Sequence, residues 1–200
     1  MAETTQFRFD ATNPAAQRWA KQYGASMVRE VSAETKAALR VLVARAIREG
    51  IPPYDMARLI VGTEQHPGMI GLTTRQMQAV LNHRTMLIDS GLSLPKVDQQ
   101  IGRLIKRKIK LRSVTIARTE TMKALNGGTK ASWIQAQKEG FLAKDAQKEW
   151  ITTGFGACVI CDGLDGQLTP LNETWGGLVP PAHPSCRCTV GFAPGEARSP

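Results

Sequence analysis

The stretch that decides how this chain ends is GACVICDGLDGQLTPLNETWGGLVPPAHPSCRCTVGF, from Gly156 to Phe192. It contains all four cysteines of the chain and one of its three histidines, His183. Glycine, proline and other turn-forming residues are frequent in it, which predicts loops and short hairpins instead of helices. Such a segment buries little apolar surface. We therefore expect its sulfur chemistry to substitute for a core.

The cysteines form two clusters whose spacing is typical of metal ligands. Cys158 and Cys161 are separated by two residues, and His183 precedes Cys186 and Cys188 by three and five residues. In an extended CRC segment, the two sulfurs point to the same side while the residue between them points away. The pattern favours a structural zinc held by the first three side chains and one of the later cysteines. Reduced structural thiols and disulfides are the alternatives. A redox-active pair is not favoured, because no recognisable helix start follows the CVIC segment.

Composition restricts the class of protein. The 200 residues, 42% of them hydrophobic, suffice for an ordinary buried core. The first twenty residues contain no positively charged start followed by an apolar run, and no window is apolar enough to span a bilayer. We therefore expect a soluble cytosolic product without a cleaved leader, and no membrane partner. A net charge of +9 and a pI near 9.7 favour association with a polyanion such as nucleic acid, or with an acidic protein.

The chain before residue 140 reads as a series of helices. A first helix is predicted to start at Asn13 and Pro14, because apolar residues then recur every four positions. These are Trp19, Tyr23, Met27 and Val31. Further amphipathic helices are expected at 32–50, 52–62 and 72–91, each ended by a glycine. Ser32 is the expected cap of the first of these, and Thr73 or Thr74 that of the last.

Residues 103–112 carry a dense cluster of positive charge. The six cations are Arg103, Lys106, Arg107, Lys108, Lys110 and Arg112. They alternate with apolar residues, which is typical of a basic amphipathic helix that contacts the phosphates of nucleic acid. The alternative is a solvated helix face whose apolar side lies in the core.

From Ser113 a helical pattern continues toward Gly140, and Gly127-Gly128 marks either a break or a close helix contact. The segment KEWITTG after it alternates like a short strand. The sequence thus predicts an α+β protein: a mostly helical N-terminal region, then a small loop-rich mixed module with short strands, stapled by metal. We place the helical region at 1–112, the module at 113–194 and a flexible tail at 195–200.

Arg118 and Glu120 in the segment ARTET allow two interpretations. An arginine and a glutamate close together can serve general-base chemistry, and a metal-bound water could serve hydrolysis. However, residues two apart on a helix point to nearly opposite sides. We therefore expect these residues to orient the module, with Arg118 contacting a backbone carbonyl or carboxylate in it.

Three segments in this order resemble one protein family. TIARTETMKALNGG, KEWITTGFGACVICDGLDGQ and PPAHPSCRC are similar to the Mu F-like head morphogenesis proteins of tailed bacteriophages. This group includes the minor head proteins of Mu and SPP1-type phages. The resemblance covers Ser113 to about Val190, and the ordered combination of the three segments is specific.

The resemblance implies a virion component and not an enzyme. It implies a minor capsid protein at the portal vertex, assembled in the host cytoplasm, that acts in head morphogenesis and in some phages in DNA packaging or ejection. The implied partners are the portal protein, other head proteins and double-stranded DNA. The charge density of residues 103–112 makes this segment the candidate nucleic-acid or portal contact. Family positions with an expected structural role are Arg118, Thr119, Glu120, Trp150, Pro181, Pro184 and Arg187. The alternative is a zinc-stapled DNA-binding protein without a capsid role.

Overall fold

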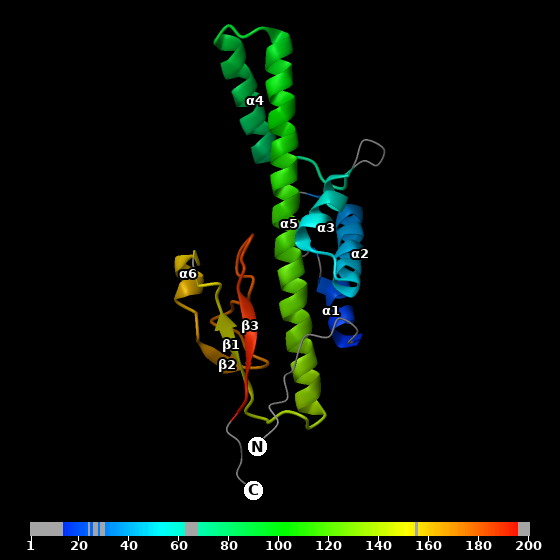
Figure 1. The fold of residues 1–200 in the computed structure, drawn as a ribbon, viewed down its shortest axis with the longest axis vertical. Coiled ribbons are helices and arrows are strands. Elements are labelled where there is room, and N and C mark those ends of the chain that lie inside the picture. The colour runs from blue at the N-terminus through cyan, green and yellow to red at the C-terminus, as the bar shows by residue number, and fades with distance from the viewer. Residues whose placement is uncertain are drawn as a thin grey trace.

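The computed structural model describes residues 14–23, 25, 28, 31–62, 68–154 and 156–195. The helices in these residues are α1 (Pro14–Tyr23), α2 (Ala33–Glu49), α3 (Pro53–Val61), α4 (Thr74–Asp89), α5 (Leu94–Lys138) and α6 (Val159–Asp162). The strands are β1 (Gln147–Ile151), β2 (Leu168–Pro170) and β3 (Thr189–Ala193). The predicted α+β class, helices first and a small loop-rich module with short strands after them, is confirmed (Figure 1).

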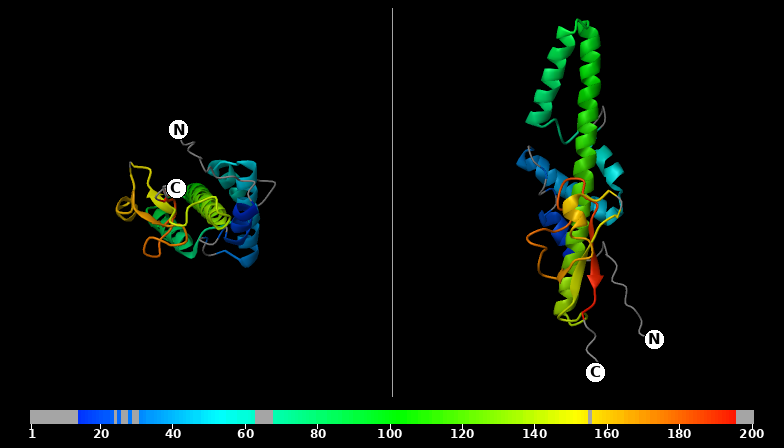
Figure 2. Two further views of the ribbon diagram at one scale, coloured as in Figure 1. Left: turned by 90° about the horizontal axis from the view of Figure 1, so that it is seen from below. Right: turned by 90° about the vertical axis from the view of Figure 1, so that its left-hand side faces the viewer.

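One long helix is the axis of the molecule. α5 has 45 residues and is therefore about 67 Å long at 1.5 Å per residue. Helices α1, α2 and α3 pack on one side of it, and the three strands with α6 lie on the other side (Figures 1 and 2). The first part of α5 pairs with α4 in a helical hairpin that projects beyond the rest of the molecule. Val80, Val97 and Ile101 are the buried residues between these two helices.

The helical body has an aliphatic core. Its fully buried side chains include Leu39, Val43, Met56 and Ile60, contributed by α2 and α3. The predicted helix signals in this region are confirmed. Ser32 caps α2 by accepting a hydrogen bond from the N–H of Thr35 at 3.1 Å. Gly50 ends the helix in the left-handed conformation, with φ 66°.

The cap at the start of α4 is also confirmed. Thr73 accepts from the backbone N–H of Gln76 at 3.2 Å, and the Gln76 side chain accepts from the Thr73 N–H at 3.0 Å. This reciprocal pair satisfies two of the amides that a helix start leaves without a partner. Gly91, with φ 79°, follows the end of the helix as predicted.

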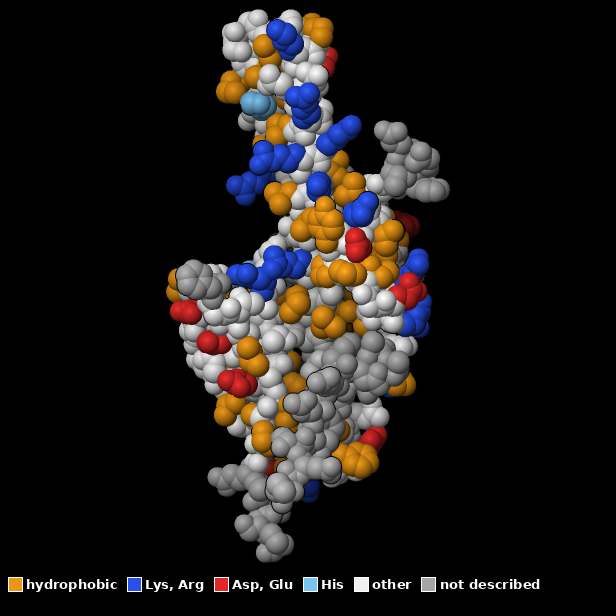
Figure 3. Space-filling view, in the orientation of Figure 1, with side chains coloured by type: hydrophobic (Ala, Val, Ile, Leu, Met, Phe, Trp, Pro, Cys, Tyr) orange, Lys and Arg blue, Asp and Glu red, His pale blue; other side chains and the backbone are white. Residues whose placement is uncertain are grey.

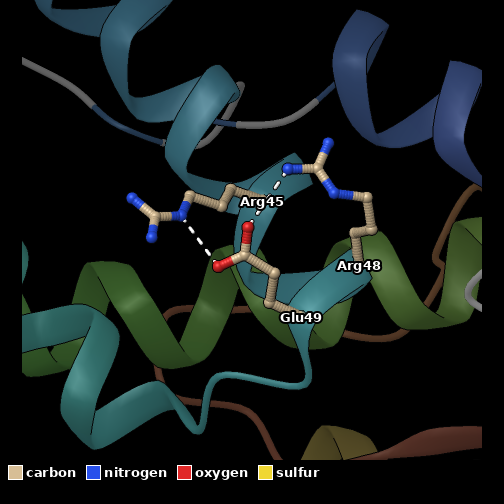
Figure 4. Close-up of polar contacts among 3 residues, drawn as sticks. All are labelled: Arg45, Arg48 and Glu49. Atoms are coloured by element: carbon tan, nitrogen blue, oxygen red, sulfur yellow. Dashed lines mark hydrogen bonds and ion pairs between the residues drawn. The ribbon is translucent and has the colours of Figure 1, made fainter.

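Ion pairs on the surface of α2 neutralise part of its charge. The carboxylate of Glu49 accepts from Arg45 at 2.8 Å and from Arg48 at 3.2 Å (Figure 4). The hydrogen bond from Arg45, followed by that from Arg48, lowers the pKa of Glu49. Because all three side chains are solvent-exposed, these pairs add little to stability.

The prediction of a first helix reaching Val31 is wrong. α1 ends at Tyr23, and Ala25 has φ 59°, a left-handed conformation that a right-handed helix cannot contain. Val31 lies in the non-helical segment before α2, and Met27 lies outside the described residues. The period of four spans Ala25, whose left-handed backbone conformation is not revealed by side-chain hydrophobicity.

The Gly127-Gly128 pair makes a close contact and does not break the helix. α5 is continuous through both residues. The ring of Trp19 in α1 lies against Gly127 so closely that a Cβ there would overlap it. α5 is equally continuous through residues 112 and 113, where the predicted domain boundary lies. Of the predicted tail, only Gly195 is among the described residues.

The three strands form an antiparallel sheet in the order β2-β1-β3, with the predicted strand β1 in the centre. A buried lysine fixes the loop that follows β2. Lys148 is 1% exposed, and its ammonium donates to the carbonyls of Pro170, Leu171 and Glu173 at 2.5, 3.0 and 2.8 Å. Its nitrogen also lies 5.1 Å from the centre of the Trp175 ring. Burial lowers the pKa of Lys148 to about 8.

Among the helices of the described residues, none combines the length and the apolar character that crossing a bilayer requires.

Candidate metal centre

The five predicted ligands meet at the end of the module, between α6 and the strand β3. Cys158 is the N-cap of α6, and its sulfur accepts from the backbone N–H of Cys161 at 3.5 Å. A short helix therefore does follow the first cysteine, contrary to the sequence interpretation. On the other side of the cluster, the Cys186 N–H donates to the His183 carbonyl at 3.1 Å, which places both residues on one turn.

The ligand atoms lie at distances that suit a tetrahedral ion. The Nε2 atom of His183 is 3.2 Å from the sulfur of Cys158 and 3.5 Å from that of Cys161. The sulfurs of Cys161 and Cys186 are 3.8 Å apart. Around a tetrahedral zinc, with Zn–S about 2.3 Å and Zn–N about 2.0 Å, neighbouring ligands lie about 3.5–3.8 Å apart. The cluster can therefore hold a metal ion with small adjustments.

The ligand atoms form two triads that share one cysteine. Cys158, Cys161 and His183 make the first triad, and Cys161, Cys186 and Cys188 make the second. All four cysteines are free thiols, and a separation of 3.8 Å is far longer than a disulfide bond of about 2.05 Å. Cys161 is the central ligand of the arrangement because it alone belongs to both triads.

The histidine has the tautomer that metal binding requires. Its Nδ1 lies 3.0 Å from the carbonyl oxygen of Pro184, and a carbonyl can only accept, so Nδ1 carries the proton. The lone pair of Nε2 then faces the sulfurs of Cys158 and Cys161. Metal-binding histidines are commonly oriented by such a contact. The same contact with Pro184 raises the pKa of His183.

The thiols of the cluster differ in acidity. Hydrogen bonds from the backbone and the side chain of Cys161 lower the pKa of Cys158 to about 7. Burial raises the pKa of Cys161 and of Cys188. Burial also disfavours the thiolate of Cys186, but hydrogen bonds from the backbone of Cys188 and Ala182 outweigh it and lower the pKa. Each triad therefore contains one thiol with a lowered pKa, Cys158 in the first and Cys186 in the second. A lowered pKa favours metal binding because the thiolate is the ligand.

The cluster is enclosed by an aromatic wall on its inner side and by arginines on its outer side. Trp150 is fully buried and packs edge-on against Trp175, with ring centres 5.2 Å apart. Both rings belong to one buried cluster with Cys161, Cys186 and Cys188. Arg118 and Arg187 line a cavity of about 260 Å³ together with the five candidate ligands. As predicted for CRC, Arg187 is exposed while the cysteines on either side of it are buried.

Polar side chains of α5 attach the module to the helical axis. Thr119 accepts from the backbone N–H of Ser185 at 2.8 Å, directly beside the ligand Cys186. The Thr119 hydroxyl itself donates to the carbonyl of Thr115, one helical turn earlier, at 2.7 Å. The hydrogen bond predicted for Arg118 is absent among the described residues, so the module contact of the ARTET segment is made by Thr119. Glu120 is 1% exposed.

Asn126 is the strongest link between α5 and the module. Its amide nitrogen donates to the carbonyls of Pro180 and Cys188 at 3.1 Å each, and its oxygen accepts from Thr189 at 2.7 Å. Neither Asn126 nor Lys148 is predicted from the sequence as a functional residue. The available signal for Asn126 was its position seven residues after Thr119, which places both polar residues on the same face of α5. The predicted position Pro181 is buried directly after the first of these carbonyls.

Four of the six cations in the predicted contact segment are exposed. Arg103, Lys106, Arg107 and Lys110 fall on one face of α5 by helical spacing, and Figure 3 shows Lys and Arg side chains gathered along this part of α5. Within the described part of the chain, neither these four nor the half-buried Lys108 takes part in an ion pair.

The prediction is wrong for Arg112, which is 8% exposed and donates to the Gly71 carbonyl at 2.6 Å. The side chain points toward the loop before α4 and is used to hold it. Charge density along the sequence does not reveal such a contact, because the two residues are 41 positions apart.

A comparison with protein families matches residues 78–191, more than half of the chain, to the family described as Phage Mu protein F like protein. The chain belongs to this family. The matched region starts within α4, well before Ser113, and ends in β3, so it includes the helical hairpin together with the module. Membership supports a role in phage head morphogenesis. The comparisons with curated proteins and with solved structures find no match.

Proposed function

We propose that this chain is a minor head protein at the portal vertex of a tailed phage, assembled in the host cytoplasm and acting in head morphogenesis. The observation that carries the proposal is the family match across residues 78–191. That region includes most of the projecting hairpin, the rest of α5 and the module with the cysteine cluster. A long rigid axis with different surfaces at its two ends suits a protein that links other head components.

Quantitative mass spectrometry tests this proposal. The protein is measured in gradient-purified virions and in portal-containing precursor complexes from infected cells. We expect a few copies per particle that co-purify with the portal protein. Absence from both fractions would contradict the proposal. Presence in virions at the copy number of the main shell protein would contradict the portal vertex as its location.

We further propose that the metal is a structural zinc bound by Cys158, Cys161, His183 and Cys186. Two features support Cys186 over Cys188 as the fourth ligand. Cys186 lies on one turn with His183, at the tetrahedral distance from Cys161. The side chain of Cys188 interacts with Trp150. Four protein ligands around one tetrahedral ion leave no open position for a water or substrate, so we propose no catalytic role for it.

Metal analysis of protein purified under reducing conditions, without added zinc, tests this assignment. We expect about one zinc per chain, the stoichiometry of a closed structural site. A preparation that is folded, reduced and free of metal would contradict the assignment and favour plain structural thiols.

DNA binding is the second candidate function. Arg103 and Arg107 of α5 favour it, because both are exposed and form no ion pair within the described residues. Replacing Arg103 and Arg107 by Glu should weaken binding to duplex DNA and reduce the salt slope by about 0.9 per lost phosphate contact. The matched control is Lys138→Glu with Lys144→Glu, which changes the net charge equally at the far end of the molecule. Equal losses in both double variants would show an effect of net charge only, and would argue against a DNA contact at this segment.

A further inference from the structure

A groove between α3 and α5 has an apolar floor that no part of the described structure covers. Its volume is about 870 Å³. Ala57 and Val61 of α3 face Ile109 and Val114 of α5 across it. Tyr54 stands at one edge and is 56% exposed. Figure 3 shows hydrophobic side chains at the surface between these two helices.

The rim of the groove is positively charged. Arg58, Lys106 and Lys110 line it. The one acidic neighbour with an ion pair at the rim is Asp55, 4.0 Å from Arg58, and both side chains are mostly exposed, so this pair is weak. Lys106 and Lys110 are one helical turn apart, a spacing at which like charges destabilise a helix. Within the described residues, neither lysine forms an ion pair with an acid.

The combination of floor and rim selects the occupant. Phosphates of nucleic acid would use the cations but would leave the aliphatic floor in water. A helix with an apolar stripe fills a groove between two other helices, and acidic residues along its flanks would meet the rim. We propose that this groove binds an acidic amphipathic helix of another head protein. The inference rests on the proposed function for the source of the partner, but the chemistry of the partner follows from the groove alone.

Site-specific photo-crosslinking in cells that assemble heads tests the proposal. The full-length chain carries a photoreactive amino acid at Tyr54, and in the control at Val41, which is 70% exposed on α2 outside the groove. We expect the Tyr54 position to crosslink to one segment of another head protein. That segment should carry net negative charge and apolar residues three and four positions apart.

Charge reversal sharpens the test. Lys106→Glu with Lys110→Glu should lower the yield of this adduct about tenfold, because rim charges accelerate and stabilise docking. The double variant Lys138→Glu with Lys144→Glu carries the same net charge and should retain the adduct. Retained folding of both variants is checked by their thermal unfolding.

Three results would overturn the groove proposal: an adduct with DNA, an adduct with a basic or non-helical segment, or no adduct above the Val41 control. The proposed function fails differently, because then the protein is absent from virions and portal-containing precursors. An acidic helix captured from a protein that is not part of the head would support the chemistry of the groove but overturn a head protein as the source of the partner.

Discussion

The two sides of α5 have interiors of different kinds. On the side of α1, α2 and α3, aliphatic residues such as Leu39, Val43 and Ile60 form the core, and many residues share the burial. On the side of the strands, two tryptophans surround a cluster of sulfur ligands, and β2 has only three residues. A smaller apolar cluster joins Trp133 of α5 to Leu142, Ala146 and Leu171 of the module. We therefore expect stability to be spread over the helical body and to depend on fewer residues in the module. Single substitutions should therefore separate the two regions.

The largest effect is expected from Cys161→Ser. It removes the ligand that both triads share, and structural zinc in small domains contributes on the order of 10 kcal/mol to folding. The module should unfold and release the metal, while the helical body stays folded. Hydrogen exchange of residues 147–193 against that of α2, together with metal content, measures this. Unchanged protection of the module would show that its apolar contacts hold it without the metal.

Leu39→Ala should destabilise the helical body and leave the module folded. The side chain is fully buried in the aliphatic core, and its removal should lower the free energy of unfolding of the helical body by about 2–5 kcal/mol. Metal content should not change. Chemical denaturation followed by far-ultraviolet circular dichroism measures the loss. The matched control is Val41→Ala on the same helix, which is 70% exposed and should change stability by less than about 0.5 kcal/mol. Loss of metal from Leu39→Ala would mean that the two regions fold as one unit.

Asn126→Ala tests the connection between the regions. It removes three hydrogen bonds and leaves the buried carbonyls of Pro180 and Cys188 without this donor, at a cost of about 2–4 kcal/mol. Hydrogen exchange should rise in β3 and in the loop before it, with the metal still bound. Asn82→Ala on the surface of α4 is the control and should alter nothing in the module. Protection of β3 equal to that of the unmodified chain would place the attachment elsewhere, with Thr119 as the next candidate.

Local signals predicted the parts of this structure that local chemistry determines. The caps at Ser32 and Thr73, the strand at Trp150 and the convergence of Cys158 with His183 all follow from side-chain type and spacing. Each depends on hydrogen bonds or ligand geometry within a short segment, or on one chemical preference shared by two segments. The fold class could be predicted for the same reason.

Contacts between distant segments could not be predicted in this way. The close contact at Gly127 is made with Trp19, which lies more than one hundred residues earlier. Charge density alone predicts that Arg112 belongs to a contact surface. The carbonyl that it binds belongs to Gly71, 41 positions earlier in the chain. The role of Asn126 depends on carbonyls of Pro180 and Cys188, whose positions are set by the whole module. A single sequence contains no local signal for such pairs.

The smallest effect is expected from Cys188→Ser, and it distinguishes the roles of the two later cysteines. If Cys186 completes the metal site, Cys186→Ser should lose the metal, whereas Cys188→Ser should retain about one equivalent. The cost of Cys188→Ser should be limited to placing a hydroxyl against Trp150, about 1–3 kcal/mol if it finds no partner. Metal analysis of both variants, with thermal unfolding, measures the difference. Loss of metal from Cys188→Ser, with metal retained by Cys186→Ser, would show the reverse. Cys188 would then be the fourth ligand, and Cys186 would only pack in the buried cluster with the tryptophans.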